Sequence, residues 1–179
     1  MGNSGKIALC GIITSLSTMV MLLTTLFPFG TYALPVMAGA LYVIIVIELG
    51  QKWAWCAFFS TSILSLLFAG DKEAALIFIL FFGYYPIIKS NIEKLRNKPI
   101  QLVIKLLIFN ITIILEFYIS IYILGVPIES LYIFGFNAAW AFLIAGNIIF
   151  VMYDLCVSIL ISKYVYVLQK SVRRIMGLK

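Results

Sequence analysis

Two acidic residues, Glu116 and Asp154, lie inside strongly apolar stretches of this sequence. A charged side chain at the centre of a membrane helix costs roughly 3 kcal/mol on insertion scales, so such residues commonly serve binding, transport or proton relay. Glu48 also falls in an apolar stretch, but it lies close enough to the end to reach water or Lys52. Glu116 and Asp154 are therefore the first candidates for function.

Polar residues recur around Glu116 at helical spacing. Thr112, Glu116 and Ser120 are four residues apart, and Lys105 precedes Thr112 by seven. Positions separated by four or seven residues share one face of a helix. The sequence therefore predicts a polar stripe along this segment.

A second polar stripe surrounds Asp154. Trp140, Asn147 and Asp154 recur every seven residues and so share a face as well. Small residues suited to close helix packing occur in the same segment at Ala138, Ala141 and Ala145. Two polar stripes on neighbouring helices predict a cavity between them.

Each of these residues also has a structural interpretation. Asn147 and Asp154 could hydrogen-bond between helices, and Asp154 could pair with Lys105 or Lys163. Glu116 favours a functional interpretation, because the only basic residue expected on its side of the membrane is Lys72. Aromatic residues near the same side form an interfacial belt or stack on a ring-bearing ligand; they are Tyr118, Tyr122, Tyr132 and Trp140.

Composition indicates the environment that positions these residues. Of 179 residues, 64% are hydrophobic and only 11% charged, with a mean hydropathy of +1.13. Soluble domains carry about 25% charged residues. The chain lacks the polar surface that covers a soluble globule, so lipid is its expected solvent.

Gly, Pro and charged residues divide the chain into six apolar segments, each long enough for a membrane span or nearly so. The last exceeds the usual length, so it tilts or projects beyond the bilayer. We predict one all-α polytopic membrane domain covering residues 1–179. Its spans are expected at about 7–27, 32–49, 53–69, 74–88, 101–124 and 137–167.

The basic residues predict the orientation of the chain. With the N-terminus inside, every Lys and Arg except Lys72 falls on the cytoplasmic side, and Lys72 is flanked by Asp71 and Glu73. This is a strong positive-inside pattern for an even number of spans. We expect both termini in the cytoplasm and the chain in a cell membrane, which the resemblance described below implies is bacterial. The net charge of +6 then needs no nucleic-acid partner.

Sequence motifs for catalysis are missing. The chain has no histidine, no Gly-x-Ser-x-Gly or His-Glu-x-x-His motif and no phosphate-binding glycine loop. Cys10, Cys56 and Cys156 match no metal spacing and are interpreted as small apolar residues. We therefore expect no enzyme activity, no catalytic residues, no cofactor and no metal, and active transport would need an external energy source.

The first segment carries Ala8, Gly11 and Ser15 at helical spacing. Such small-residue stripes let helix backbones approach closely within a membrane. The stripe predicts close packing, either inside this chain or against another subunit.

In size, topology and this stripe, the chain resembles the S components of energy-coupling factor vitamin transporters, small substrate-binding membrane subunits. The resemblance implies a coupling subunit and two ATPases as partners. It also implies that the first helix contacts the coupling subunit through an Ala-x-x-x-Ala pattern, which Ala8-Leu9-Cys10-Gly11-Ile12 approximates. A vitamin-like ligand would bind near the outer side. Its candidate contacts are Glu116, Asn137, Trp140 and Asn147, with Asp154, Thr112 and Ser120 as structural or relay residues.

Two other functions fit the same features. A non-catalytic membrane scaffold of an envelope or cell-shape complex, similar to the MreD proteins, also lacks catalytic motifs. An ion-coupled carrier would use Glu116 and Asp154 as relay acids.

Overall fold

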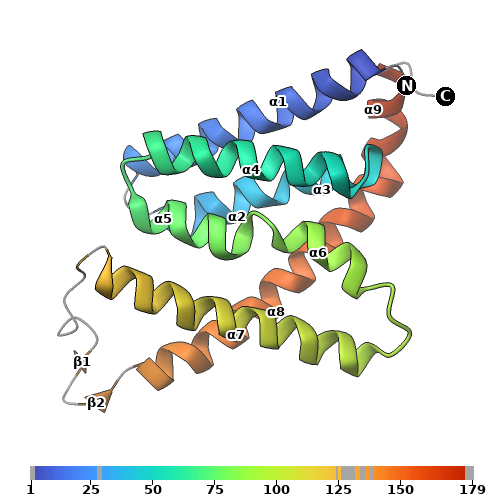
Figure 1. The fold of residues 1–179 in the computed structure, drawn as a ribbon. Coiled ribbons are helices and arrows are strands. Elements are labelled where there is room, and N and C mark those ends of the chain that lie inside the picture. The colour runs from blue at the N-terminus through green and yellow to red at the C-terminus, as the bar shows by residue number, and fades with distance from the viewer. Residues whose placement is uncertain are drawn as a thin grey trace. The chain divides into compact units, whose positions relative to one another are not determined.

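The computed structural model describes residues 3–27, 30–123, 125, 132–133, 136–137 and 139–175 (Figure 1). This part of the chain is helical, apart from a minimal antiparallel pairing of β1 (Tyr132–Ile133) with β2 (Phe136–Asn137). The chain divides into two compact units. Unit 1 comprises residues 1–90 and 156–179, and unit 2 comprises residues 91–155.

Four helical stretches in the described residues are long and apolar enough to cross a membrane. They are Ser4–Thr25, Lys72–Ile92, Lys98–Tyr122 and Leu143–Leu168, and a shorter apolar stretch covers Ala33–Glu48. Large apolar side chains on these helices face outward, as Ile12 and Ile149 do at 63% and 65% exposure. The predicted all-α fold is confirmed at this level, and the exposed apolar surface suits a lipid environment.

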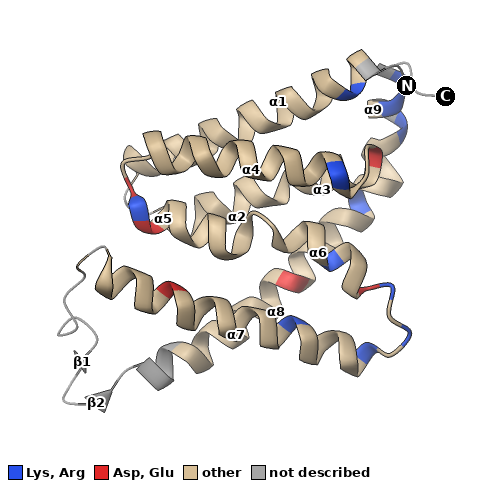
Figure 2. Ribbon diagram, viewed as in Figure 1, with Lys and Arg blue, Asp and Glu red and all other residues tan. Residues whose placement is uncertain are grey.

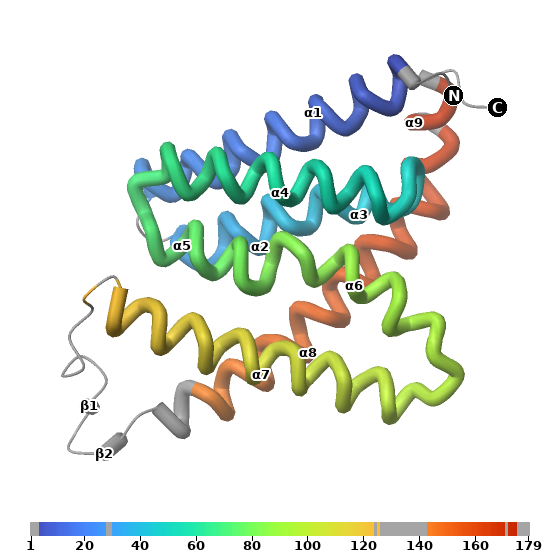
Figure 3. Tube along the Cα trace, viewed as in Figure 1, coloured from blue at the N-terminus to red at the C-terminus, as the bar shows by residue number. Residues whose placement is uncertain are grey.

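Unit 1 is built on two parallel helices, α1 (Asn3–Leu22), continued by the 3₁₀ turn η1 (Leu23–Thr25), and α4 (Gln51–Phe68). Near their starts the Cys10 thiol donates to the Trp53 carbonyl over 3.7 Å. Near their ends the Gly70 N–H donates to Thr25 Oγ1 at 2.8 Å. These contacts join residues 43 and 45 positions apart, so the helices run side by side in the same direction (Figure 3).

The segment expected as one helix over 32–49 is two helices, α2 (Ala33–Ala40) and α3 (Tyr42–Glu48), separated by a turn at Leu41. Ser17 of α1 reaches this break, where its hydroxyl donates to the Ala38 carbonyl at 3.1 Å and contacts the Tyr42 hydroxyl at 3.3 Å. A side chain from another helix therefore satisfies a backbone group at the interruption.

The next apolar segment also departs from a uniform helix. It consists of α5 (Lys72–Ile77), the π-helix η3 (Phe78–Phe82) and α6 (Tyr85–Ile92). Asp71 caps α5, accepting from the Ala74 N–H at 3.0 Å. Gly39 of α2 packs against the Phe82 carbonyl so closely that an added Cβ would overlap that oxygen. Glycine at this position allows the backbones of α2 and η3 to touch.

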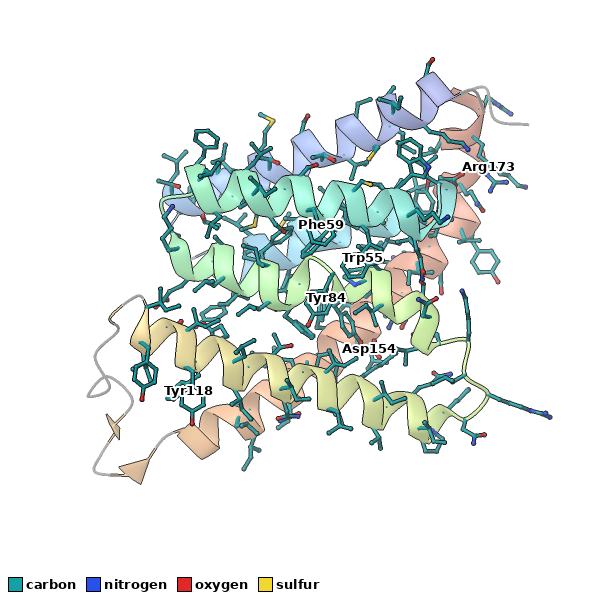
Figure 4. The ribbon with its side chains drawn as sticks, in the orientation of Figure 1. Trp55, Phe59, Tyr84, Tyr118, Asp154 and Arg173 are labelled. Carbon is teal, nitrogen blue, oxygen red and sulfur yellow. The ribbon has the colours of Figure 1, made fainter. Side chains whose placement is uncertain are left out.

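Aromatic rings fill the core between α4 and the η3–α6 stretch. Trp55 stacks on Tyr84 with ring centroids 6.5 Å apart (Figure 4). Phe58 meets Trp55 and Tyr84 edge to face. Phe78 and Phe81 are almost completely buried beside them. Edge-to-face and offset pairs are the favoured aromatic arrangements and add to the packing energy.

Unit 2 contains α7 (Lys98–Tyr122), β1, β2 and the first part of α8 (Ala139–Lys163). The remainder of α8, the π-helix η5 (Tyr164–Leu168) and α9 (Gln169–Ile175) belong to unit 1. The predicted segments thus overlap the observed helices, with a break at Leu41 and π-helical or turn residues over 78–84. The structure also extends α6 to Ile92, beyond residue 88, and places Asn137 in β2 instead of the last span. The grouping of both units into one membrane domain stays a prediction.

The close contact at Gly39 can be tested by adding one methyl group. We expect Gly39→Ala to destabilise the protein by about 2 kcal/mol, because the Phe82 carbonyl belongs to a packed helix and cannot easily move. Gly11→Ala is the matched control, since an added Cβ there has no neighbour within 4 Å. Thermal unfolding in detergent should show a lower midpoint for Gly39→Ala alone. Equal midpoints for the two variants would contradict the assigned contact.

Candidate functional site

The most extensive polar contacts described within unit 2 lie where α7 meets α8. The Lys105 ammonium of α7 donates to both carboxylate oxygens of Asp154 on α8, at 2.9 and 3.0 Å. It also donates to Glu93 Oε1 at 2.9 Å. The Lys105 and Asp154 side chains are 6% and 14% exposed. The structure thus places Asp154 against Lys105, one of the two partners considered from the sequence.

An amide pair lies further along the same two helices. The side chains of Asn110 and Asn147 donate to each other's amide oxygens at 2.9 and 3.0 Å. Each also donates to the carbonyl four residues earlier in its own helix, at 2.8 Å. Both N–H groups of Asn147 are therefore used inside the protein, which favours its helix-packing interpretation over ligand contact.

Between the ion pair and the amide pair, Phe109 of α7 stacks on Phe150 of α8 with ring centroids 4.7 Å apart and planes at 12°. Gly146 makes room for the Phe109 ring, which lies 3.4 Å from the position a Cβ would take. Residue numbers rise along α7 as they fall along α8, so the helices are antiparallel. We call these contacts the α7–α8 seam: Lys105 with Asp154, Phe109 with Phe150, and Asn110 with Asn147.

Glu116 lies beyond the seam, toward the C-terminal end of α7. It is partly buried, and the Ser120 hydroxyl donates to its Oε1 at 3.1 Å. Thr112 and Ser120 are both buried, as expected for one polar stripe on α7. Glu116 is about 9 Å along the helix from Asn110 and as far from Tyr122, at 1.5 Å per residue.

Two tyrosines mark this end of α7. The Tyr118 and Tyr122 rings are nearly parallel, at 9°, with centroids 6.2 Å apart, and both are more than half exposed. The side chains of Asn137 and Trp140, the other predicted ligand contacts, lie outside the described residues. The described site therefore consists of a carboxylate, two neighbouring hydroxyls and two phenol rings.

Glu48 has a different environment from the one expected. Its side chain is 1% exposed, and it accepts from Arg173 Nε at 3.0 Å and from the Tyr164 hydroxyl at 3.3 Å. The sequence suggested that Glu48 reaches water or Lys52. That expectation is wrong because the C-terminal part of the chain, 125 residues away, lies against the end of α3.

Sequence reasoning also missed two polar residues. Lys89, which follows the span expected over 74–88, is fully buried in α6 and donates to Ser158 of α8 at 2.8 Å. Asn110 received no role, although an amide in the middle of an apolar helix is itself a signal for pairing. Lys89 lies within a helix because α6 continues to Ile92, beyond the expected end of that span at about residue 88.

The small-residue stripe of α1 faces away from the core of unit 1. Ala8, Gly11 and Ser15 are exposed and line a shallow open groove together with Ile12, Leu16 and Met19. Within the described structure, this stripe is available for a contact outside unit 1.

The α7–α8 seam predicts an unequal response to losing either charge. Lys105→Met leaves Asp154 and Glu93 facing each other without their shared cation, so we expect about 3 kcal/mol of destabilisation. Asp154→Asn keeps an acceptor and leaves the Glu93 contact, so we expect about 1 kcal/mol. Thermal unfolding in detergent measures both. A larger loss for Asp154→Asn than for Lys105→Met would contradict this assignment of the network.

Among the described residues, no group of three or more Cys, Asp or Glu side chains is arranged to hold a metal ion. Comparisons with protein-family models, with curated proteins and with solved structures find no match for this chain. Its function is therefore to be inferred from its own residues and their geometry.

Proposed function

We propose that the chain crosses a bacterial cell membrane six times with both termini in the cytoplasm. Four of these spans are the long apolar helical stretches, and the other two are α2–α3 and α4. The α4 helix is less apolar because it starts at Gln51-Lys52 and carries four hydroxyl residues. The parallel contacts of α1 and α4 fit two spans that enter from the same side, with α2–α3 returning between them. The antiparallel seam of α7 and α8 fits consecutive spans.

The charges support this orientation. Several Lys and Arg positions of unit 1 lie at the end where α1 and α4 begin and where α9 lies (Figure 2). Lys72, by contrast, lies between Asp71 and Glu73 at the start of α5. Basic residues concentrate on the cytoplasmic side of membrane proteins, so that end of unit 1 is assigned to the cytoplasm.

On this topology, we propose that the chain is the small-molecule-binding subunit of a membrane uptake transporter whose ATPases are separate chains. The observation that carries the proposal is the position of Glu116, a partly buried carboxylate in the outer half of a membrane-spanning helix. Tyr118 and Tyr122 suit an interfacial position, which places Glu116 a few ångströms to about 9 Å inside the outer interface. A ligand could reach it from outside without crossing the membrane.

The residues near Glu116 suggest what is bound. A carboxylate at low dielectric favours a cationic or ammonium-bearing ligand. The hydroxyls of Thr112 and Ser120 add hydrogen-bonding capacity, and exposed tyrosine rings offer faces for stacking or cation–π contact. A vitamin-like molecule with a ring and a basic group combines these properties.

Uptake against a gradient needs an energy source, and the sequence contains no nucleotide-binding loop. The exposed stripe of Ala8, Gly11 and Ser15 on α1 is the surface we assign to a membrane coupling subunit. Small residues permit the close helix contact through which two membrane subunits could move together. Such a coupling subunit would in turn connect the chain to its ATPases.

A membrane scaffold is the second candidate. The same outward α1 stripe would bind an envelope protein, and the paired Asn110 and Asn147 suit a purely structural helix contact. The function of a scaffold would not depend on the charge of Glu116. An ion-coupled carrier would instead require Asp154 to change protonation while Lys105 holds it.

Ligand binding should raise the thermal stability of the purified protein. We expect one or more members of a vitamin panel to raise its melting temperature, and Glu116→Gln to abolish most of that rise, because the amide removes the charge but keeps the shape. Glu73→Gln is the matched control, an acid of the same kind outside the candidate site. No shift with any vitamin, together with no ATPase co-purifying from native membranes, would reject the transporter proposal.

The topology has its own test in cysteine labelling of intact cells. In a variant whose three cysteines are replaced, Lys72→Cys should react with a membrane-impermeant maleimide added outside. Lys94→Cys should react only after the cells are opened. The reverse pattern, or labelling of both in intact cells, would refute the proposed orientation.

A further inference from the structure

Two helices of unit 1 carry the same polar pattern at the same spacing. In each, a lysine is followed four residues later by a cysteine, and four residues after that by a hydroxyl residue. On a helix, positions four residues apart lie on one face, about one turn from each other. The two sets are Lys6, Cys10 and Thr14 on α1, and Lys52, Cys56 and Ser60 on α4.

The parallel register of α1 and α4 brings the two sets to the same level. Corresponding members are 46 positions apart in the sequence, close to the separations of 43 and 45 that join α1 to α4 directly. The Cys10 thiol points at the Trp53 carbonyl. In a helix, that carbonyl lies beside the side chain of the residue three positions later, which is Cys56.

Both cysteines line one open groove between the helices, with a volume of ≈ 320 Å³. Thr14 and Ser60 also line the groove, but their hydroxyls donate to the carbonyls of Cys10 and Cys56 at 2.8 and 2.9 Å. The two sulfur atoms are therefore the side-chain atoms of the groove that we consider as ligands for an ion.

We propose that Cys10 and Cys56 form a two-thiolate site for a soft metal ion, with Cu(I) as its model occupant. Thiolates are the ligands that select Cu(I) over harder ions. Two thiols release two protons when the ion binds, giving a bis-thiolate complex of net charge −1. Lys6 and Lys52, one turn away on the same faces, supply the compensating positive charge that such a complex needs near lipid.

This site is separate from the Glu116 site, although Gly11 and Ser15 of the stripe assigned to the coupling subunit also line its groove. The two cysteines lie on different helices, so no Cys-x-x-Cys spacing marks them in the sequence. Two thiol ligands are also fewer than the three or more protein ligands that hold Zn²⁺. A groove open on one side would allow an ion to enter or be passed to another thiol carrier.

The test uses the full chain, purified in neutral detergent under reducing, oxygen-free conditions. Cu(I) is offered in competition with the coloured chelator bicinchoninate, and the loss of chelate colour reports transfer to the protein. We expect one Cu(I) per chain for the wild type. Cys10→Ser and Cys56→Ser should each weaken binding at least tenfold, whereas Cys156→Ser, the matched control at an exposed cysteine, should bind as the wild type does.

A second measurement checks the geometry without metal. Dibromobimane fluoresces strongly only after it bridges two thiols, so it should label the wild type and Cys156→Ser but neither of the other two variants. Bridging without Cu(I) uptake would overturn the metal site. A disulfide between the two cysteines, seen as a mass 2 Da below that of the dithiol in unreduced protein that binds no Cu(I), would also overturn it. Absence of bridging would overturn the pairing itself. The double variant Lys6→Gln/Lys52→Gln should keep bridging but bind Cu(I) several-fold more weakly.

Discussion

The structure depends on one constraint: on helices as apolar as these, a polar side chain is stabilised chiefly by partners within the protein. Hydroxyl residues meet it locally, as when Thr14 and Thr18 donate to carbonyls four residues earlier at 2.8 and 2.9 Å. Other polar side chains, short or long, find a partner on another helix. Lys105, Asn110 and Ser17 each do so, and these contacts set which helices are neighbours.

This constraint explains what could be predicted from the sequence. Helix positions follow from apolar length and from Gly, Pro and charged residues, so the observed helices begin and end close to the expected bounds. The polar stripe on α7 was also predictable, because Lys105, Thr112 and Ser120 share a face by spacing alone, and all three are buried. The site itself follows from this pattern, since Glu116 belongs to the same stripe.

What could not be predicted is which polar groups meet across large separations. Glu48 pairs with Arg173 over 125 residues, and no local pattern marks that choice. The break at Leu41 has no marked local pattern either, and the contacts that α2 makes just before it come from Ser17 and Phe82, distant in the sequence. Periodicity identifies the face of a helix, whereas pairing depends on the path of the entire chain.

The α7–α8 seam shows why a chain so poor in charged residues keeps a nearly buried ion pair between two apolar helices. Well-packed apolar residues often replace a buried ion pair without loss of stability, so the Lys105–Asp154 contact has its clearest value in specificity. Stacked rings such as Phe109 and Phe150 tolerate sliding, but a slip of one helical turn would separate the ion pair and the Asn110–Asn147 pair together. The polar contacts therefore fix the register of α7 against α8. The position of Glu116 relative to α8 follows from that register, so the contacts of the seam determine where the carboxylate of the proposed binding site lies.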